Sequence, residues 1–322
     1  MTYKRKITFL SGAIAALVIL YILTIIFDPQ RIGSRSDAYT WLDLKQKNRI
    51  DRINIISQNE AVVLERSGGE WFVSHDGKDY PARQMRVDDF IDALGKRASY
   101  PVRSSSASSH ERLSLVEGIS TQIIVSAGAG IPLLNLLIGQ GDVTGQDVYL
   151  RKQGHNEVRS GKDIFSAYTE STLVSWYNLR LFPESETGKL DPAGIQRLTV
   201  YPPAGGGDSL PCIFARRGRE WSITGMDIAN PDIGKIDSYI RDILNATGDD
   251  FADTAGLSSQ HFNDSRIVLE LGDGSIRTLR LGAGGDDDRY LATVTGSDYV
   301  YAIPGWVSRR LFPEPDSFEK DL

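Results

Sequence analysis

Two segments decide the fold: RIDRINI at residues 49–55 and GIQRLTV at residues 194–200. Both have the pattern x-Ile-x-Arg followed by an aliphatic, a polar and an aliphatic residue, which predicts a β-strand with one buried face. A Glu-Trp pair follows each of them, at residues 70–71 and at residues 220–221. The two strands are therefore the first landmarks of an internal repeat.

Three further landmarks recur in the same order: a stretch with helical spacing of apolar residues, an aliphatic-Gly pair followed by a Tyr-containing strand, and the pentapeptide Arg-Leu-Phe-Pro-Glu. In the first half they are Val87, Phe90 and Leu94, then Ile138-Gly139 with residues 148–150, then Arg180 to Glu184. In the second half they are Ile233, Ile236 and Ile240, then Leu281-Gly282 with residues 289–291, then Arg310 to Glu314. The spacing between matched positions varies between 150 and 130 residues, which is typical of duplication followed by changes in loop length. The alternative is two unrelated domains that share a simple strand pattern.

Short predicted strands occur in runs on both sides of one helix in each copy. Before the helix they lie at residues 53–55, 61–66 and 70–73 in the first copy and at 198–201, 212–215 and 221–223 in the second. After the helix they lie at residues 121–126, 133–138 and 147–152, and at 265–271, 276–281 and 289–294. Runs of strands separated by turn residues predict antiparallel hairpins and an α+β fold, not an alternating βαβ fold. Each copy is expected to be an antiparallel sheet with a helix over one face.

The second helix has a recognisable start. Asn230 is expected to be its N-cap, Pro231 its first residue, and Asp232 an acid that favours the positive end of the helix dipole. Residues 103–111, which contain a run of serines, are expected to be an exposed loop. The polar residues 247–254 take their place in the second copy.

The segment from Ile7 to Phe27 is an uninterrupted run of 21 uncharged residues. As a helix it spans about 30 Å, the thickness of the hydrocarbon core of a bilayer. Lys4, Arg5 and Lys6 precede it, so the positive-inside rule places the amino terminus in the cytoplasm. A cleavable signal peptide is the alternative, but its apolar core is shorter, about 7–15 residues, and no small-x-small cleavage site follows here. We therefore expect an uncleaved anchor in the bacterial inner membrane, with residues 28–322 in the periplasm.

The expected architecture is α+β, with an N-terminal transmembrane helix followed by two tandem copies of an antiparallel-sheet-plus-helix unit. Residues 1–27 form the cytoplasmic stub and anchor, residues 28–48 a linker, residues 49–188 the first repeat and residues 189–322 the second. With 41% hydrophobic and 24% charged residues, the composition excludes a disordered or fibrous protein. Residues 28–322 contain 33 Lys and Arg against 42 Asp and Glu, so nucleic acid is not an expected partner.

Residues that commonly bind metals or act as nucleophiles are present but do not form a recognisable motif. None of the four histidines has a second ligand at zinc spacing; they are His75, His110, His155 and His261. Cys212 is the one cysteine, so it forms no disulfide within the chain, and no histidine lies near it in the sequence. Asp286-Asp287-Asp288 lacks the Gly and the closing Glu of an EF-hand and is expected to be a solvated turn.

Glycine-rich stretches also fail to predict a nucleotide site. Gly154 and Gly161-Lys162 do not have the spacing of a P-loop, and no Ser or Thr follows the lysine. Gly128-Ala129-Gly130 lies between two predicted strands and is expected to be a hairpin turn, because a dinucleotide fingerprint would lead into a helix. The sequence therefore predicts no catalytic residue, no cofactor site, no metal site and no enzyme activity.

Trp71 and Trp221 recur in both copies, as do the Leu-Phe-Pro segments at residues 181–183 and 311–313. We expect the tryptophans to pack under the helices and the Phe-Pro pairs to end the final helix of each copy. The alternative is that the tryptophans stack on a ligand. Repetition favours packing, because a fold needs such an anchor in each copy, whereas a binding site usually needs it once.

The extracytoplasmic part resembles a family of bacterial proteins known as a domain of unknown function. Besides the membrane-anchored start, the resemblance rests on the strand at residues 50–55, on Glu70-Trp71, on Tyr80-Pro81-Ala82 and on Asn178-Leu179-Arg180. Members of that family are commonly encoded beside ABC-type export systems related to those of gliding motility. The resemblance therefore implies an auxiliary component with protein partners in a transporter complex, and it implies no catalytic residue in this chain.

Two hypotheses of function follow. In the first, the protein is a non-enzymatic, single-pass inner-membrane protein whose duplicated periplasmic domain binds partners in an ABC-type export or gliding-motility-like system. In the second, it is an envelope enzyme or a carbohydrate-binding module that uses the crevice between the repeats, with Trp71, Trp221 or tyrosine residues stacking on sugar rings. The sequence identifies neither the partners, nor a transported substrate, nor the oligomeric state.

Overall fold

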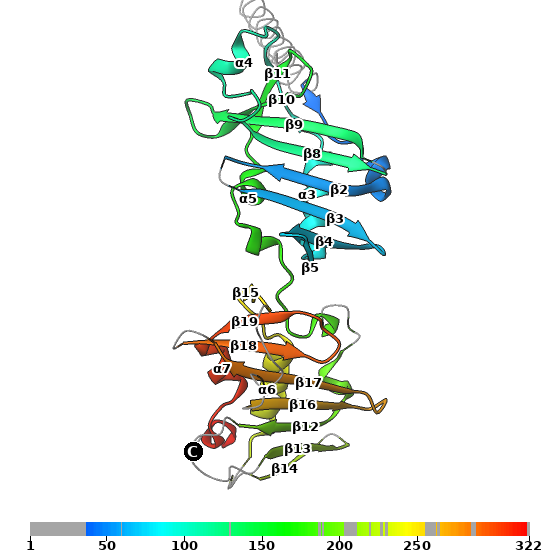
Figure 1. The fold of residues 1–322 in the computed structure, drawn as a ribbon, viewed down its shortest axis with the longest axis vertical. Coiled ribbons are helices and arrows are strands. Elements are labelled where there is room, and N and C mark those ends of the chain that lie inside the picture. The colour runs from blue at the N-terminus through cyan, green and yellow to red at the C-terminus, as the bar shows by residue number, and fades with distance from the viewer. Residues whose placement is uncertain are drawn as a thin grey trace, which may run out of the picture. The chain divides into compact units, whose positions relative to one another are not determined.

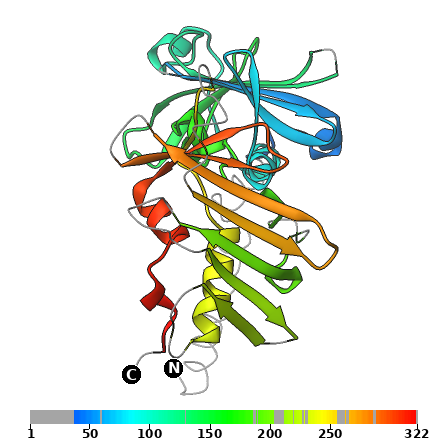
Figure 2. The ribbon, with the colours of Figure 1, turned by 60° about the horizontal axis from the view of Figure 1, so that its bottom comes forward.

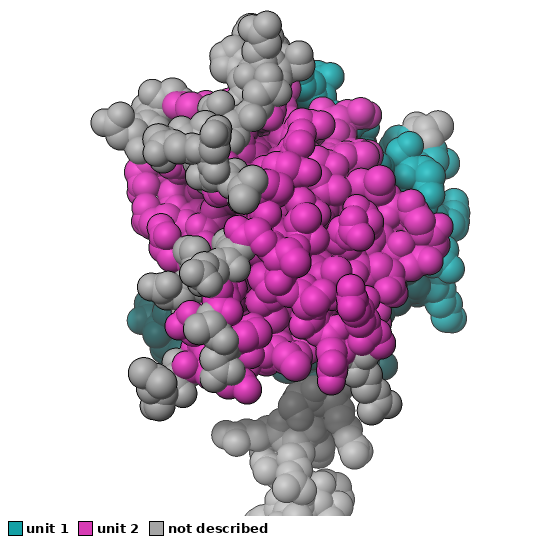
Figure 3. Space-filling model, turned by 90° about the horizontal axis from the view of Figure 1, so that it is seen from below, with its two compact units in different colours: residues 1–176 teal, residues 177–322 magenta. Residues whose placement is uncertain are grey.

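The computed structural model describes residues 37–320, except residues 59, 129, 186–187, 189, 203–210, 219, 226–227, 229–230, 255–261, 263–264 and 285–287. The transmembrane helix expected at residues 7–27 lies outside these described residues. Within them, no helix is both long enough and apolar enough to cross a bilayer. The chain divides into two compact units, unit 1 (Met1–Trp176) and unit 2 (Tyr177–Leu322), which are coloured separately in Figure 3.

Unit 1 contains a nine-stranded antiparallel sheet with the strand order β5-β4-β3-β2-β8-β9-β10-β11-β7 (Figure 1). Its strands are β2 (Ile50–Ile56), β3 (Ala61–Ser67), β4 (Glu70–His75), β5 (Lys78–Pro81), β7 (Val102–Ser104), β8 (Thr121–Ala127), β9 (Ile131–Gly141), β10 (Asp147–Lys152) and β11 (Val158–Lys162). A separate pair is formed by β1 (Ala38–Tyr39) and β6 (Ala98–Ser99). The helices of unit 1 are η1 (Leu44–Arg49), α3 (Gln84–Gly95), α4 (Ser109–Arg112), α5 (Ser166–Thr169) and η2 (Leu173–Trp176), where η denotes a 3-10 helix.

One face of the unit 1 sheet is buried against α3. In β2, Ile53 and Ile55 are buried while Asn54 between them is half-buried, as the two-residue period of a strand requires. The α3 residues that face the sheet are spaced by three, one and three positions, which places them on one side of a helix; they are Val87, Phe90, Ile91 and Leu94. The core of unit 1 therefore lies between one sheet face and α3.

Unit 2 contains an eight-stranded antiparallel sheet with the order β14-β13-β12-β16-β17-β18-β19-β15. Its strands are β12 (Ile195–Tyr201), β13 (Cys212–Arg217), β14 (Glu220–Thr224), β15 (Asp250–Phe251), β16 (Ser265–Leu271), β17 (Ile276–Ala283), β18 (Arg289–Val294) and β19 (Val300–Pro304). Its helices are η3 (Pro183–Ser185), η4 (Pro192–Gly194), α6 (Ile233–Leu244), α7 (Gly305–Leu311) and η6 (Pro315–Phe318). Figure 2 shows α6, in yellow, lying along one face of this sheet. The fold class is α+β, because antiparallel sheets are combined with a few helices.

The two sheets have the same topology. From one edge to the other, β4-β3-β2-β8-β9-β10-β11-β7 in unit 1 corresponds to β14-β13-β12-β16-β17-β18-β19-β15 in unit 2, and β5 is an additional edge strand of unit 1. The pairing of β2 with β8 is irregular between Ile50 and Arg52. The pairing of β12 with β16 is irregular between Ile195 and Arg197, at the same place in the x-Ile-x-Arg pattern. The shared motif therefore produces the same local distortion in both sheets.

The exposed loop predicted for residues 103–111 is confirmed only for residues 105–108, which are exposed and lie outside helices and strands. Residues 103–104 are the end of β7, in which Ser104 pairs with Val158 of β11, and residues 109–111 belong to the short helix α4. In unit 2, residues 247–254 contain β15, in which Asp250 pairs with Ala302 of β19. The sequence did not reveal β7 and β15, because each of these short strands is formed by pairing with the last long strand of its sheet, which is far away in the sequence.

The start of α6 also differs from the prediction. Asp232 is the N-cap, and its Oδ1 accepts hydrogen bonds from the backbone N–H groups of Gly234 (2.8 Å) and Lys235 (3.3 Å). Pro231 precedes the cap and is not the first helical residue. Asn230, the residue expected to cap the helix, lies outside the described residues. The acid that was assigned to the helix dipole is therefore the capping residue itself.

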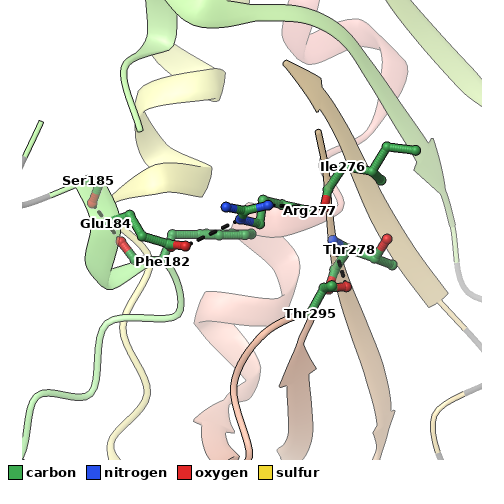
Figure 4. A network of polar contacts seen from close by, with 7 residues as sticks. All are labelled: Phe182, Glu184, Ser185, Ile276, Arg277, Thr278 and Thr295. Carbon is green, nitrogen blue, oxygen red and sulfur yellow. Dashed lines mark hydrogen bonds and ion pairs between the residues drawn. The ribbon is translucent and has the colours of Figure 1, made fainter. Parts of the chain in front are cut away.

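Both copies of the repeated pentapeptide lie in unit 2, whereas the sequence predicted that the first copy, Arg180 to Glu184, closes the first repeat. Leu181 and Phe182 are fully buried in the core of unit 2. Glu184 forms an ion pair with Arg277 of β17, with 3.3 Å between Oε1 and Nε (Figure 4). The division between the units follows Trp176, twelve residues before the expected boundary at residue 188.

Candidate functional site

The C-terminal turn of α6 forms one side of a surface on unit 2. The helix buries a stripe of residues spaced by three and four positions; these are Ile236, Tyr239, Ile240, Ile243 and Leu244. Asp242 and Asn245 lie beside this stripe, three residues apart, and line a small cavity. The amphipathic pattern of α6 therefore places these two polar side chains next to each other at the surface.

The other side of this surface is formed by α7, which follows β19 directly. Val307 and Leu311 are four residues apart and are buried in the core. Trp306 lies outside that stripe and is 57% exposed. The hydroxyl of Tyr239 donates a hydrogen bond to the Leu311 carbonyl oxygen at 2.6 Å, which joins α6 to α7. Burial raises the pKa of Tyr239, so its hydroxyl stays protonated and keeps this bond.

The arginine that begins each pentapeptide contacts the C-terminal end of α6. Arg310 Nη2 lies 2.8 Å from Asp242 Oδ1, and Arg180 Nη1 donates to Asn245 Oδ1 at 2.9 Å. The backbone of the first pentapeptide is held in the same region, because the Leu181 N–H donates to the Ala246 carbonyl oxygen at 3.0 Å. The two identical segments therefore meet at the same turn of α6.

These contacts surround a cavity of about 90 Å³. Its apolar lining is provided by Ala246, Val307 and Leu311, and Trp306 lies at its side. We call the residues around it the Trp306 surface; they are Asp242, Asn245, Ala246, Thr247, Trp306, Val307, Arg310 and Leu311. A cavity of this size holds roughly one small apolar side chain, since a CH₂-sized group occupies a few tens of Å³ and a water about 30 Å³.

The charge around the Trp306 surface differs from that of the rest of unit 2. Residues 177–322 contain 15 Lys and Arg against 23 Asp and Glu. Arg309 and Arg310 are 71% and 60% exposed, and Arg241 is exposed in the last turn of α6. The nearby acids Asp242 and Asp288 are each paired with one of the arginines of α7. Because two of these three arginines are paired with acids, the surface carries only a small positive charge within an acidic unit.

This combination is suited to binding a protein segment. Exposed tryptophan and arginine are enriched among the residues that dominate protein interfaces, and an adjacent apolar cavity can accept a partner side chain. Arginines at the rim favour partners with carboxylates.

The two tryptophans that were candidates for ligand stacking lie in the cores. Trp71 is 3% exposed and Trp221 is 7% exposed. Trp221 Nε1 donates to Asp237 Oδ1 of α6 at 3.0 Å, which fixes the ring under that helix. The predicted packing of both tryptophans is confirmed, so neither ring is available to stack on a sugar.

The three histidines that the structure describes belong to no metal-binding group. Among the described residues, no group of three His, Cys, Asp or Glu side chains is placed to hold a metal ion. His75 and His155 are exposed, and His110 Nε2 lies 3.1 Å from the carbonyl oxygen of Asn156. His261 lies outside the described residues.

The remaining candidate residues from the sequence that the structure describes lie in strands, in turns or in an ion pair. Cys212 is buried in β13, and burial raises the pKa of its thiol to about 12, so it is not a thiolate at neutral pH. Gly161 and Lys162 belong to β11, and the described residues of Gly128-Ala129-Gly130, Gly128 and Gly130, lie in the turn between β8 and β9. Asp288 lies next to Arg309, with 3.3 Å between Oδ1 and Nη1, and residues 286–287 lie outside the described part.

Sequence reasoning did not identify Trp306 as a candidate, although a signal was present. In the segment Gly305-Trp306-Val307-Ser308-Arg309-Arg310-Leu311, only Val307 and Leu311 have the spacing of a buried helical stripe. This spacing places the tryptophan on the side that faces away from the core. What the sequence could not supply is the neighbour of that tryptophan, because α6 lies more than 60 residues earlier.

Comparison with known proteins gives one match. A protein-family model described as "Domain of unknown function (DUF4340)" matches residues 71–260, which is more than half of the chain. No curated protein and no solved structure matches the chain.

Proposed function

The chain belongs to the DUF4340 family, and from this starting point we propose that it is a non-enzymatic protein that binds other proteins through the Trp306 surface. The observation that carries the proposal is the 57% exposure of Trp306 beside a small cavity that Val307, Leu311 and Arg310 help to line. Covering a large aromatic side chain with a partner removes apolar surface from water, which favours binding.

The partner that fits this surface is a protein segment with an apolar side chain flanked by carboxylates. The apolar side chain enters the 90 Å³ cavity beside Trp306, and the carboxylates lie next to Arg309 and Arg310. Such a segment is attracted by the local positive charge and repelled by the rest of unit 2, which favours one orientation.

For the location of the protein we propose the topology expected from the sequence. Residues 7–27 anchor the chain in the bacterial inner membrane, the amino terminus is cytoplasmic, and residues 28–322 are periplasmic. Within this topology, the partners are subunits of an ABC-type export or gliding-motility-like system, of which this protein is an auxiliary component. Support comes from the basic residues before the apolar run and from the family resemblance.

We also propose that units 1 and 2 arose by duplication of one ancestral unit. The shared strand order and the matching irregularity after Ile50 and Ile195 support this origin. A further common feature is an arginine over each buried tryptophan: Arg66 lies 5.9 Å from the Trp71 ring and Arg216 lies 5.2 Å from the Trp221 ring.

The test is photocrosslinking in membranes. A photoreactive amino acid replaces Trp306 in the full chain, and the adducts formed on illumination are identified by mass spectrometry. We expect adducts with extracytoplasmic segments of transporter subunits. In parallel, Trp306→Ala should lower the recovery of these subunits after mild solubilisation by about tenfold or more, the usual loss at a central interface residue.

Met85→Ala is the matched control, because Met85 is 77% exposed on α3 of unit 1 and lies far from the Trp306 surface in sequence. It should leave recovery unchanged. The proposal is wrong if the chain is recovered alone after crosslinking, or if both variants lower recovery equally. The topology is tested separately by adding protease to spheroplasts, which should remove residues 28–322 while cytoplasmic markers stay intact.

A further inference from the structure

Unit 1 contains a polar cleft of about 600 Å³ that the proposed function does not use. Its lining comes from the turn between β2 and β3, with Gln58 and Glu60, from the neighbouring ends of β8 and β9, with Thr121 and Gln140, and from the segment after α5. This volume falls within the range of about 300–1,000 Å³ that is typical of small-molecule sites. The cleft is therefore large enough to take a small ligand or a single extended side chain with its flanking backbone.

The segment after α5, which includes Ser171 and Leu173, is held by hydrogen bonds from α3 and from the β2–β3 turn. Arg86 of α3 donates to Ser171 Oγ at 2.9 Å, and its guanidinium lies 4.7 Å from the Trp176 ring. Glu60 Oε2 accepts a hydrogen bond from the Leu173 N–H at 3.1 Å across the cleft wall. These contacts fix both the segment and the Glu60 carboxylate before any ligand arrives, which lowers the entropic cost of binding.

Several polar side chains of the cleft donate their protons to the protein itself. Each of four side chains donates to a backbone carbonyl oxygen: Ser57 to Glu60, Gln58 to Ile119, Thr169 to Phe165 and Ser171 to Tyr168. Their oxygen atoms keep lone pairs for a ligand, although Ser57 Oγ already accepts from the Glu60 N–H and Ser171 Oγ from Arg86. The carboxylates of Glu60 and Glu170 add groups that only accept, so a ligand rich in N–H donors finds acceptors in the cleft.

The charge of the lining also favours a positively charged, donor-rich ligand. Glu60 and Glu170 contribute two carboxylates, and no Lys, Arg or His belongs to the described lining. Arg86 lies behind the wall, and even with its charge included the local balance is negative. Ammonium and guanidinium groups carry only donors and a positive charge, so they match both properties.

We propose that this cleft binds an ammonium or guanidinium group. The group can belong to a free polyamine or to a Lys or Arg side chain of a peptide. In either case its N–H groups donate to the Glu60 and Glu170 carboxylates and to the free oxygen acceptors of the lining. This site is independent of the Trp306 surface, which lies in unit 2.

The test is isothermal titration calorimetry of the detergent-solubilised full chain at low ionic strength, with spermidine and with tri-lysine amide as probes. We expect saturable binding of at least one probe and none of tri-glutamate. Glu170→Gln should weaken binding about three- to tenfold, because it removes one carboxylate of the lining and leaves the contacts of Glu60 intact. Glu60→Gln should weaken it similarly, and its thermal unfolding is measured to confirm that the wall is still folded.

Asp89→Asn is the matched control, since Asp89 is exposed on α3, does not line the cleft, and carries the same charge. Binding to this variant should stay within twofold of the wild type. Binding of spermidine alone identifies a free amine as the ligand, and binding of tri-lysine alone identifies a peptide. The inference is overturned if neither probe binds, if Glu170→Gln has no effect, or if Asp89→Asn weakens binding as much, because the attraction is then to the acidic protein in general. Trp306→Ala should not change the result, so failure here leaves the proposal for unit 2 unaffected.

Discussion

Unit 2 should depend on residues that precede the boundary predicted from the sequence. Leu181 and Phe182 are fully buried in the core of unit 2. A fragment that begins at residue 189 lacks both side chains. Truncating a buried Leu to Ala costs about 2–5 kcal/mol, and truncating a buried Phe costs about 3–5 kcal/mol. Because the two residues are neighbours, their effects do not simply add. Removing both should cost on the order of 5 kcal/mol, against a total stability of about 5–15 kcal/mol for a domain.

The assay compares two fragments, residues 177–322 and residues 189–322, by urea unfolding. Fluorescence of Trp221 and Trp306 reports on the unit, and circular dichroism reports on its sheet. With an m-value of about 1–3 kcal/mol per molar urea, a loss of this size lowers the midpoint by about 2 M or more, or leaves the shorter fragment unfolded without denaturant. The longer fragment should unfold cooperatively.

Point variants of the full chain test the effect of the buried side chains without shortening the chain. Phe182 is 0% exposed, whereas Phe312, at the same place in the second pentapeptide, is only partly buried. Phe182→Ala should therefore destabilise unit 2 more than Phe312→Ala. The reasoning is refuted if the two fragments have the same midpoint, or if Phe312→Ala is the more damaging substitution.

Three further predictions concern single residues. Asp232→Ala should lower stability by about 0.5–2 kcal/mol through loss of the α6 N-cap, while Ser238→Ala on the exposed side of that helix should change it by less than about 0.5 kcal/mol, as measured by urea unfolding. Gly139→Ala should cost about 1–3 kcal/mol, because the added Cβ would lie 2.2 Å from a backbone carbonyl oxygen, whereas Gly128→Ala meets nothing within 4 Å; similar melting temperatures for both would contradict this. Cys212 should not react with a thiol reagent at pH 8 until the protein unfolds. The pKa of the Cys212 thiol is about 12 in the folded protein, above the ordinary 9.0. The stability that the protonated thiol contributes is therefore fully present below pH 9 and is lost as the pH rises towards 12, which unfolding measured at several pH values would detect.

The long central strands could be predicted because their sequences carry the signal by themselves. The segment Ser265–Leu271 alternates buried and partly exposed residues, and its predicted bounds agree with those of β16. The helix α6 was predicted from the spacing of Ile233, Ile236, Ile240 and Ile243. The last three belong to its buried face, whereas Ile233, the first helical residue, is 42% exposed. In these elements, local propensity, hydrophobic period and burial all favour the same structure.

The short edge strands could not be predicted in this way. β15 has two residues, Asp250 and Phe251, and β7 has three. Strands this short gain their stability from hydrogen bonds to the long strand beside them, here β19 and β11, and not from their own sequence. Each contains a single apolar residue, Phe251 in β15 and Val102 in β7, which cannot show the two-residue period of a strand. They therefore resemble a loop until the partner strand is known.

The pentapeptide Arg-Leu-Phe-Pro-Glu shows why a repeated motif does not establish a repeated role. Its two copies are identical, yet Phe182 is in the core and Phe312 is at its margin, because burial depends on what each segment packs against after the chain has folded. Both leucines are buried in the same core, and both arginines contact the same turn of α6, through Asn245 and Asp242. The motif therefore does not close two equivalent units, as duplication alone would suggest. It brings two guanidinium groups to the C-terminal turn of α6, whose residues Asp242 and Asn245 line one cavity with Trp306 and Arg310. This concentration of features in unit 2 is the reason to look for the protein partner there and not at the equivalent place in unit 1.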